Sequence, residues 1–143
     1  MSNWSLRFVG LAQHIASWSK DPSTQVGAVI TGPRNMVTSL GFNGFPRGVV
    51  DSPERYADRD IKYKLVSHAE RNALDNCNVS VTGHTLYVTR HPCSECAKSI
   101  VQKGISRVVY LPHPEFDARW ADDIAIAKLI LSECGVDLVA VTC

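Results

Sequence analysis

Two short segments, His68-Ala69-Glu70 and Pro92-Cys93-Ser94-Glu95-Cys96, decide how this chain can fold. One imidazole and two thiolates at this spacing are the donors of a tetrahedral zinc site, so the two segments must meet in space. Three protein ligands leave a fourth position for water, which is typical of a catalytic zinc. Glu70 would then stand beside that water as a general acid/base without ligating the metal.

A closed structural zinc site is the alternative interpretation, and it needs a fourth protein ligand. The candidates for that ligand are His84, His91, His113 and Cys77. A C-x2-C pair alone would leave the two interpretations even. The His-Ala-Glu triplet at a predicted helix start, and the proline before the first cysteine, favour the catalytic one. We therefore expect one catalytic zinc per chain, bound by His68, Cys93 and Cys96.

Composition limits the class of protein. The 143 residues, 45% of them hydrophobic, suffice for a single domain over 1–143 with a substantial core. A net charge of +1 gives no basic footprint for a long nucleic acid, so we expect no nucleic-acid partner. No apolar run approaches the roughly 18 residues of a membrane span. The five cysteines are an odd number, which argues against a disulfide scaffold. These features predict a cytoplasmic protein with no membrane partner.

The pattern of apolar residues predicts alternating helices and strands. A first helix follows from apolar residues at steps of three and four from Trp4 to Trp18, and Asp21-Pro22 should stop it. We expect Ser67 to cap a helix that begins at His68. The strands are predicted at 26–30, 36–42, 85–89, 107–111 and 136–141, an irregular loop at 44–54, and the later helices at 68–77, 93–103 and 118–134.

This order of elements predicts an α/β fold. The first two strands form an antiparallel hairpin, and the later strands, separated by helices, imply parallel crossovers. We expect a five-stranded mixed sheet with helices on both faces. The metal ligands would then lie at the starts of two helices, where the positive helix ends favour thiolates.

Four sequence blocks stand out. They are Asp21-Pro22-Ser23-Thr24-Gln25-Val26-Gly27-Ala28, Gly41-Phe42-Asn43-Gly44-Phe45-Pro46-Arg47-Gly48, His68-Ala69-Glu70-Arg71-Asn72-Ala73-Leu74 and Thr89-Arg90-His91-Pro92-Cys93-Ser94-Glu95-Cys96-Ala97-Lys98. With these blocks in order, the chain resembles the deoxycytidylate (dCMP) deaminases of the zinc-dependent cytidine/deoxycytidylate deaminase superfamily over nearly its full length. The resemblance implies the three-layer α/β/α cytidine deaminase-like fold and zinc-dependent hydrolysis of dCMP to dUMP and ammonia, supplying thymidylate synthesis. It also implies a homohexamer activated by dCTP and inhibited by dTTP.

The nucleotide needs donors for its phosphate and sugar. We expect backbone N–H groups around Ser23-Thr24 and Asn43-Gly44 to bind the phosphate, with charge from Lys20, Arg47 or Arg90. Asn43 is the candidate for a sugar hydroxyl, because its amide can both donate and accept. The predicted substrate-binding residues are Ser23, Thr24, Asn43, Ala69, Arg90 and His91, and the candidates for coupling the pocket to an allosteric or subunit interface are Gly44, Arg47, Phe116 and Arg119.

Several rivals share the metal centre. Nucleoside cytidine deaminases resemble Cys-Ala-Glu, so His68 counts against them. A tRNA adenosine deaminase shares His-Ala-Glu, but residues 43–48 and the near-neutral charge favour a mononucleotide. A deaminase acting on dCTP is a closer rival, because pocket depth decides the phosphate number. A zinc-dependent interaction module without turnover is a further alternative, which an intact Glu70 argues against. The compact segment 49–67 predicts no second metal.

Overall fold

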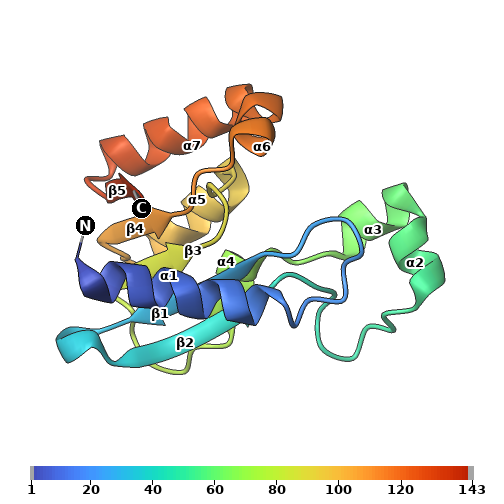
Figure 1. The fold of residues 1–143 in the computed structure, drawn as a ribbon, viewed down its shortest axis with the longest axis horizontal. Helices are drawn as coiled ribbons and strands as arrows, with labels where there is room; N and C mark the ends of the chain where they lie inside the picture. The colour runs from blue at the N-terminus through green and yellow to red at the C-terminus, as the bar shows by residue number, and fades with distance from the viewer. Residues whose placement is uncertain (1, 142–143) are drawn as a thin grey trace.

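A five-stranded mixed sheet forms the centre of the molecule in the computed structural model, which describes residues 2–141 (Figure 1). β1 pairs antiparallel with both β2 and β3, while β3–β4 and β4–β5 are parallel. The predicted mixed sheet is therefore confirmed. Across the sheet the strands are β2 (Val37–Phe42), β1 (Gly27–Thr31), β3 (Thr85–Val88), β4 (Arg107–Tyr110) and β5 (Asp137–Ala140).

Helices cover both faces of this sheet and give three layers. One face is covered by α1 (Asn3–Ala16), and the other by α4 (Ala69–Asp75), α5 (Ser94–Gln102) and α7 (Ala121–Glu133). The short helices α2 (Pro53–Ala57) and α3 (Arg59–Leu65) project beyond one end of the sheet (Figure 1). The α/β/α prediction is confirmed.

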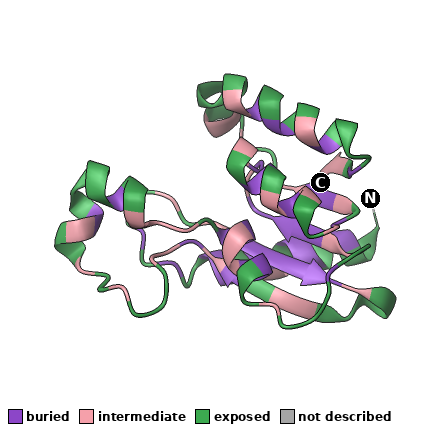
Figure 2. Cartoon of the chain, turned by 180° about the vertical axis from the view of Figure 1, so that it is seen from behind, coloured by how far each residue is buried: buried purple, intermediate pink, exposed green. Residues whose placement is uncertain are grey.

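The alternating sides of the strands supply two hydrophobic cores. Ile30, Leu86 and Val108 face α4, α5 and α7, where they pack with Ile100 and Leu131. Their strand neighbours Val29, Tyr87 and Val109 face α1 and pack with Phe8 and Ala12. β1 is buried throughout and β3 and β4 are buried in their middle, whereas α2 and α3 are mostly exposed (Figure 2). The metal-ligand helices are thus held against the larger core.

Two glycines permit close approach of helices to the sheet. A Cβ atom on Gly27 would lie 2.0 Å from the Ala12 carbonyl oxygen of α1. On Gly41 it would lie 2.5 Å from the Ala73 nitrogen of α4. Both glycines occur in the sequence blocks quoted above. Part of that signature therefore serves packing and not chemistry.

Three element predictions need correction, and two helices lie where none was predicted. The first helix ends at Ala16, before Trp18, because the chain turns to let the Ser19 hydroxyl donate to the Asn43 carbonyl at 2.8 Å. The segment that follows the predicted loop contains α2 and α3. Ser52 caps the start of α2, and Asp58 caps the start of α3.

Within residues 2–141 no helix is long and apolar enough to cross a membrane.

The other two corrections concern helix starts. Ser67 is not the cap of α4, because its backbone pairs with Gly44; His68 occupies the cap position in an extended conformation. The helix predicted over 118–134 is two helices, α6 (Pro114–Arg119) and α7, which meet at Trp120. His113 begins α6 by accepting the Phe116 N–H at 3.1 Å.

Candidate metal centre and active site

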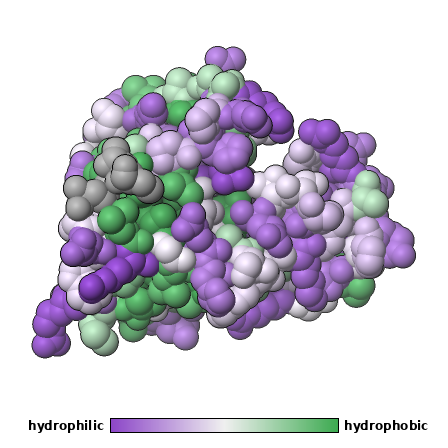
Figure 3. Space-filling model, in the orientation of Figure 1, coloured by the Kyte–Doolittle hydropathy of each residue, from purple (hydrophilic) through white to green (hydrophobic). Residues whose placement is uncertain are grey.

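The loops that carry the predicted site residues meet at one end of the sheet. Backbone bonds between Ser67 and Gly44, of 2.8 and 3.1 Å, place His68 beside the loop that follows β2. The Asn72 side chain reinforces this contact by donating to the Phe42 carbonyl at 2.8 Å. The molecular surface is hollowed between the α6–α7 end and the hydrophilic α2–α3 end (Figure 3).

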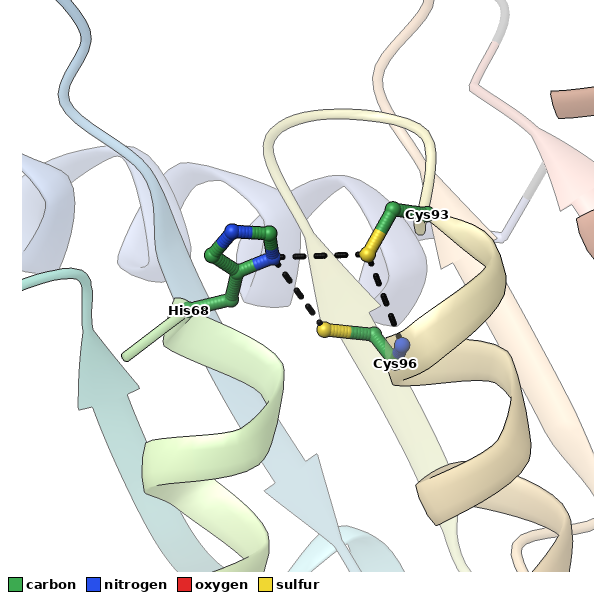
Figure 4. Close-up of side chains that lie close together, drawn as sticks. All are labelled: His68, Cys93 and Cys96. Atoms are coloured by element: carbon green, nitrogen blue, oxygen red, sulfur yellow. Dashed lines mark hydrogen bonds between the residues drawn. The ribbon is translucent and has the colours of Figure 1, made fainter. Parts of the chain in front are cut away.

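His68, Cys93 and Cys96 face one another across the N-terminal ends of α4 and α5 (Figure 4). The His68 Nδ1 atom lies 3.4 Å from each of the two Sγ atoms, and the three ligand atoms lie within 4.8 Å of one another. Zinc bonds of about 2.3 Å to sulfur and 2.1 Å to nitrogen would separate tetrahedral N and S ligands by about 3.6 Å. The distances from His68 to both thiols therefore fit a zinc ion bound by all three residues.

The structure offers no fourth protein ligand within residues 2–141. The four candidates for a closed site lie outside the ligand group. His84 and His91 direct Nδ1 to the backbone carbonyls of Thr82 and Pro92, at 3.2 and 2.8 Å. Cys77 lies 3.4 Å from the Val79 carbonyl oxygen. The arrangement is the open, three-ligand type.

The three ligands form a charged hydrogen-bonded group. Cys93 has a pKa of about 4, because its thiolate accepts a hydrogen bond from Cys96 and lies close to His68. The hydrogen bond to Cys93 raises the pKa of His68 to about 9. The pKa of Cys96 is raised, first by its hydrogen bond to Cys93 and then by burial. Cys93 is therefore the first thiol to ionise, with support from the Cys96 N–H, 3.4 Å from its sulfur.

Glu70 lies in the first turn of α4, buried beside the ligand group. Only 4% of the residue is exposed, and it does not belong to the set of atoms that could hold the metal. Burial raises the pKa of the Glu70 carboxyl, and the Cys93 charge raises it further. A carboxyl with a raised pKa next to a metal site is suited to take up and release a proton.

The backbone N–H groups predicted to bind phosphate are already occupied. Those of Ser23 and Thr24 donate to Asp21 Oδ1, at 2.8 and 3.3 Å. Those of Asn43 and Gly44 donate to the carbonyls of Val26 and Ser67. The loops use these groups to hold their own shape, and the predicted backbone contacts with phosphate stay a prediction. The hydroxyls of Ser23 and Thr24 stay candidates.

Asn43 is buried and organises the loop before β1. Its Oδ1 accepts the Val26 N–H at 2.8 Å, and its Nδ2 donates to the Thr24 carbonyl at 2.9 Å. A weaker contact of 3.4 Å joins Nδ2 to Asp21. The amide thus serves the fold, and the predicted contact with a sugar hydroxyl stays a prediction.

The structure brings Arg90 and Phe116 together and leaves Arg119 apart. The Arg90 guanidinium lies 5.6 Å from the centre of the Phe116 ring, a cation–π contact between the β3–α5 loop and α6. Arg119 is exposed.

His91 is buried, and its ring packs edge to face with that of Tyr110, with 4.6 Å between the ring centroids. Burial lowers the pKa of His91. Its Nε2 atom has no partner in the described part of the chain.

Three residues have roles that the sequence did not predict: Asp21, Lys62 and Asp123. Asp21 had a local signal, because an Asp two residues before a Ser favours a turn in which its carboxylate accepts backbone N–H groups. Lys62 and Asp123 had none, since their partners lie far along the chain. Lys62 donates to Asp21, and Asp123 accepts from Ser94.

The family model described as "Cytidine and deoxycytidylate deaminase zinc-binding region" matches residues 2–112. The chain belongs to this family. It is 44% identical over 140 residues to an uncharacterised deaminase in the luxG 3′ region of Aliivibrio fischeri, covering 96% of this chain and 93% of that one. It is 39% identical over 139 residues to human deoxycytidylate deaminase, covering 93% and 76% respectively.

A solved structure shares the fold of this deaminase family member. The dCMP deaminase of cyanophage S-TIM5, in apo form, superposes with a TM-score of 0.77 at 23% identity, covering 99% of this chain and all of that one. At this identity the likeness speaks to the fold alone. It agrees with the three layers described above.

Proposed function

We propose that this deaminase hydrolyses dCMP to dUMP and ammonia, and so supplies dUMP for thymidylate synthesis. The observation that carries the proposal is the three-ligand group with buried Glu70 beside it. Relatives named deoxycytidylate deaminase support the choice of nucleotide, from human at 39% identity and from Mycobacterium phage D29 at 37%. Zinc bound to the group would supply Lewis-acid activation of a water molecule.

The proposed chemistry assigns two proton transfers to Glu70. Its carboxylate takes a proton from the attacking water and delivers it to N3 of the cytosine ring, while the C4–O bond forms. It then takes the remaining hydroxyl proton and delivers it to the amino nitrogen, while the C4–N4 bond breaks and ammonia leaves. Burial suits Glu70 to this role, because it raises the pKa of the carboxyl. A carboxyl with a raised pKa is a stronger base in one step and can still donate the proton in the next.

Other residues would hold the nucleotide against this centre. Ala69 is the first residue of α4, and first-turn N–H groups have no partner within their own helix, so Ala69 could bind the base. His91, which is buried, would contact the base. Ser23 and Thr24 would offer hydroxyls from the loop that Asn43 holds, and Arg90, from the β3–α5 loop, would offer charge.

Regulation by dCTP and dTTP in a homohexamer belongs to the same proposal. A cavity of about 400 Å³ lies between β2 and α4, and Gly44 and Arg47 are among its lining residues. A nucleotide there would contact the same loop that carries Asn43 and pairs with Ser67, next to His68. Exposed apolar side chains on the edge strand β2, Val37 and Leu40, suit contact with another subunit.

Parallel assays on dCMP, dCTP, CMP and deoxycytidine test the substrate. We expect dCMP to exceed deoxycytidine by at least about 100-fold in kcat/KM, because anion-binding groups left without the phosphate are costly. Equal rates on deoxycytidine would indicate a nucleoside deaminase. A preference for dCTP would replace the proposal with its closest alternative.

A further inference from the structure

Asp123, in the first turn of α7, binds Ser94, the first residue of α5, through both of its carboxylate oxygens. Oδ2 accepts the Ser94 N–H at 3.0 Å, and Oδ1 accepts the Ser94 hydroxyl at 2.6 Å. The second distance is typical of a charge-assisted bond. These bonds hold the pKa of Asp123 below its ordinary value. Ser94 is therefore fixed by its backbone and its side chain together.

Ser94 lies between the two thiol ligands. It directly follows Cys93, which begins α5, and Cys96 is in the first turn of the same helix. Two N–H groups in the first turn of α5 have different acceptors: that of Cys96 donates to the Cys93 sulfur, and that of Ser94 donates to Asp123. A shift of Ser94 would move Cys93 relative to both Cys96 and His68.

The support for Asp123 comes from the core. α7 packs along α5 through buried Ala127 and Leu131, in the cluster that also holds Ala97 and Ile100. Asp123 precedes Ile124, itself 7% exposed. The Asp123 carboxylate thus extends from a helix that the core holds in place. Its two bonds to Ser94 restrict the movement of the first turn of α5, which carries Cys93 and Cys96.

We propose that Asp123 is a positioning residue of the metal centre, acting through Ser94 to fix Cys93 at its distance from Cys96 and His68. The proposal rests on the proposed zinc site, and goes beyond it by naming a residue outside the ligand set. Partners behind metal ligands typically contribute 10–100-fold in metal affinity. Asp123 has that position relative to a thiolate turn.

The test measures zinc affinity by competition with a chromophoric chelator, together with the visible spectrum of the cobalt(II) protein. Asp123→Asn keeps the shape but removes the negative charge, so the charge-assisted bond from the Ser94 hydroxyl is lost and the zinc Kd should rise about 10–100-fold. The cobalt bands should also shift as the ligand geometry changes. Asp122→Asn is the matched control, because Asp122 is an exposed residue in the same turn with the same charge.

Each outcome has a clear meaning. Weaker zinc binding in Asp123→Asn, with Asp122→Asn like the unmodified protein, supports the proposal. An unchanged Kd and cobalt spectrum, or equal weakening in both variants, overturns it. If Asp123→Asn does not fold, Ser94→Ala decides, since it removes one of the two bonds: an unchanged Kd overturns the proposal and a raised one supports it. An unmodified protein that binds no zinc overturns the proposed function itself.

Discussion

Lys62 of α3 and Asp21 of the loop before β1 form a buried ion pair, with Nζ 2.9 Å from Oδ1. The side chains are only 11% and 4% exposed. Asp21 Oδ1 also accepts the N–H groups of Ser23 and Thr24, so the carboxylate that closes the loop also anchors α3. The α2–α3 end, which has little core of its own, is therefore tied to the end of the sheet where the site lies.

Removal of Lys62 should destabilise the protein severely. Lys62→Met leaves the Asp21 carboxylate buried without its charge partner, which costs about 3–5 kcal/mol of unfolding free energy. Urea unfolding measures the loss. Lys64→Met, on the same helix but exposed, should change stability by no more than about 0.5 kcal/mol. Equal stability of the two variants would show that the buried pair contributes nothing.

Loss of either thiol ligand should release the metal. Cys93→Ala and Cys96→Ala each leave two ligands, and the bound zinc, about one per chain in the unmodified protein, should be lost with some stability. Elemental analysis of purified protein measures the zinc. Cys134→Ala, which removes an exposed free cysteine, is the control and should keep the metal. Full retention in both ligand variants would rule out this site.

The ionised thiol of Cys93 predicts an unusual pH profile in chelator-treated protein. Its pKa of about 4 lies below the ordinary 9.0, so the thiolate fraction stays nearly constant between about pH 6 and 8. The rate at which iodoacetamide modifies Cys93 should therefore be independent of pH between about 6 and 8. The Cys93→Ser variant identifies the part of the reaction that belongs to this thiol. An ordinary thiol would gain nearly tenfold per pH unit over this range, and such a gain would contradict the prediction.

The same shifts predict how the stability of chelator-treated protein varies with pH. The lowered pKa of Cys93 contributes stability that is complete above pH 9.0 and lost as the pH falls through about 4. The raised pKa of His68 contributes stability that is complete below pH 6.5 and lost as the pH rises through about 9. Between pH 6.5 and 9 the two contributions change in opposite directions, so the unfolding free energy should fall only as the pH drops below about 6.5 toward 4, which urea unfolding at a series of pH values measures.

Regulation should show in the shape of the saturation curve. If subunits share nucleotide sites, dCMP saturation is sigmoidal, becomes hyperbolic with dCTP, and is opposed by dTTP. Phe116→Ala and Arg119→Ala should change this response more than they change zinc content. Steady-state kinetics with each triphosphate, and the mass of the assembly in solution, measure it. A monomer with hyperbolic kinetics, indifferent to both triphosphates, would remove the regulatory claim alone.

The predictable parts of this fold were the ones that local patterns encode. The apolar run at β1 and the C-x2-C spacing at the start of α5 depend on neighbours in sequence, and both elements lie within a residue or two of their predicted positions. Helix α3 was not predicted, and the contact that anchors it, Lys62 to Asp21, spans 41 residues and leaves no local pattern. The loop N–H groups predicted to bind phosphate donate to Asp21, Val26 and Ser67 within the fold, and their contact with phosphate stays a prediction.

Turnover of dCMP by Glu70→Gln is the most direct test of the account. The amide keeps the shape of the side chain and removes the proton carrier, so zinc content should be unchanged while kcat falls about 10²–10⁴-fold or more. The assay is ammonia release from dCMP by zinc-loaded protein, with the metal measured in the same samples. A large loss of kcat with zinc retained is the predicted result; near-normal kcat would contradict the role of Glu70 and the mechanism built on it.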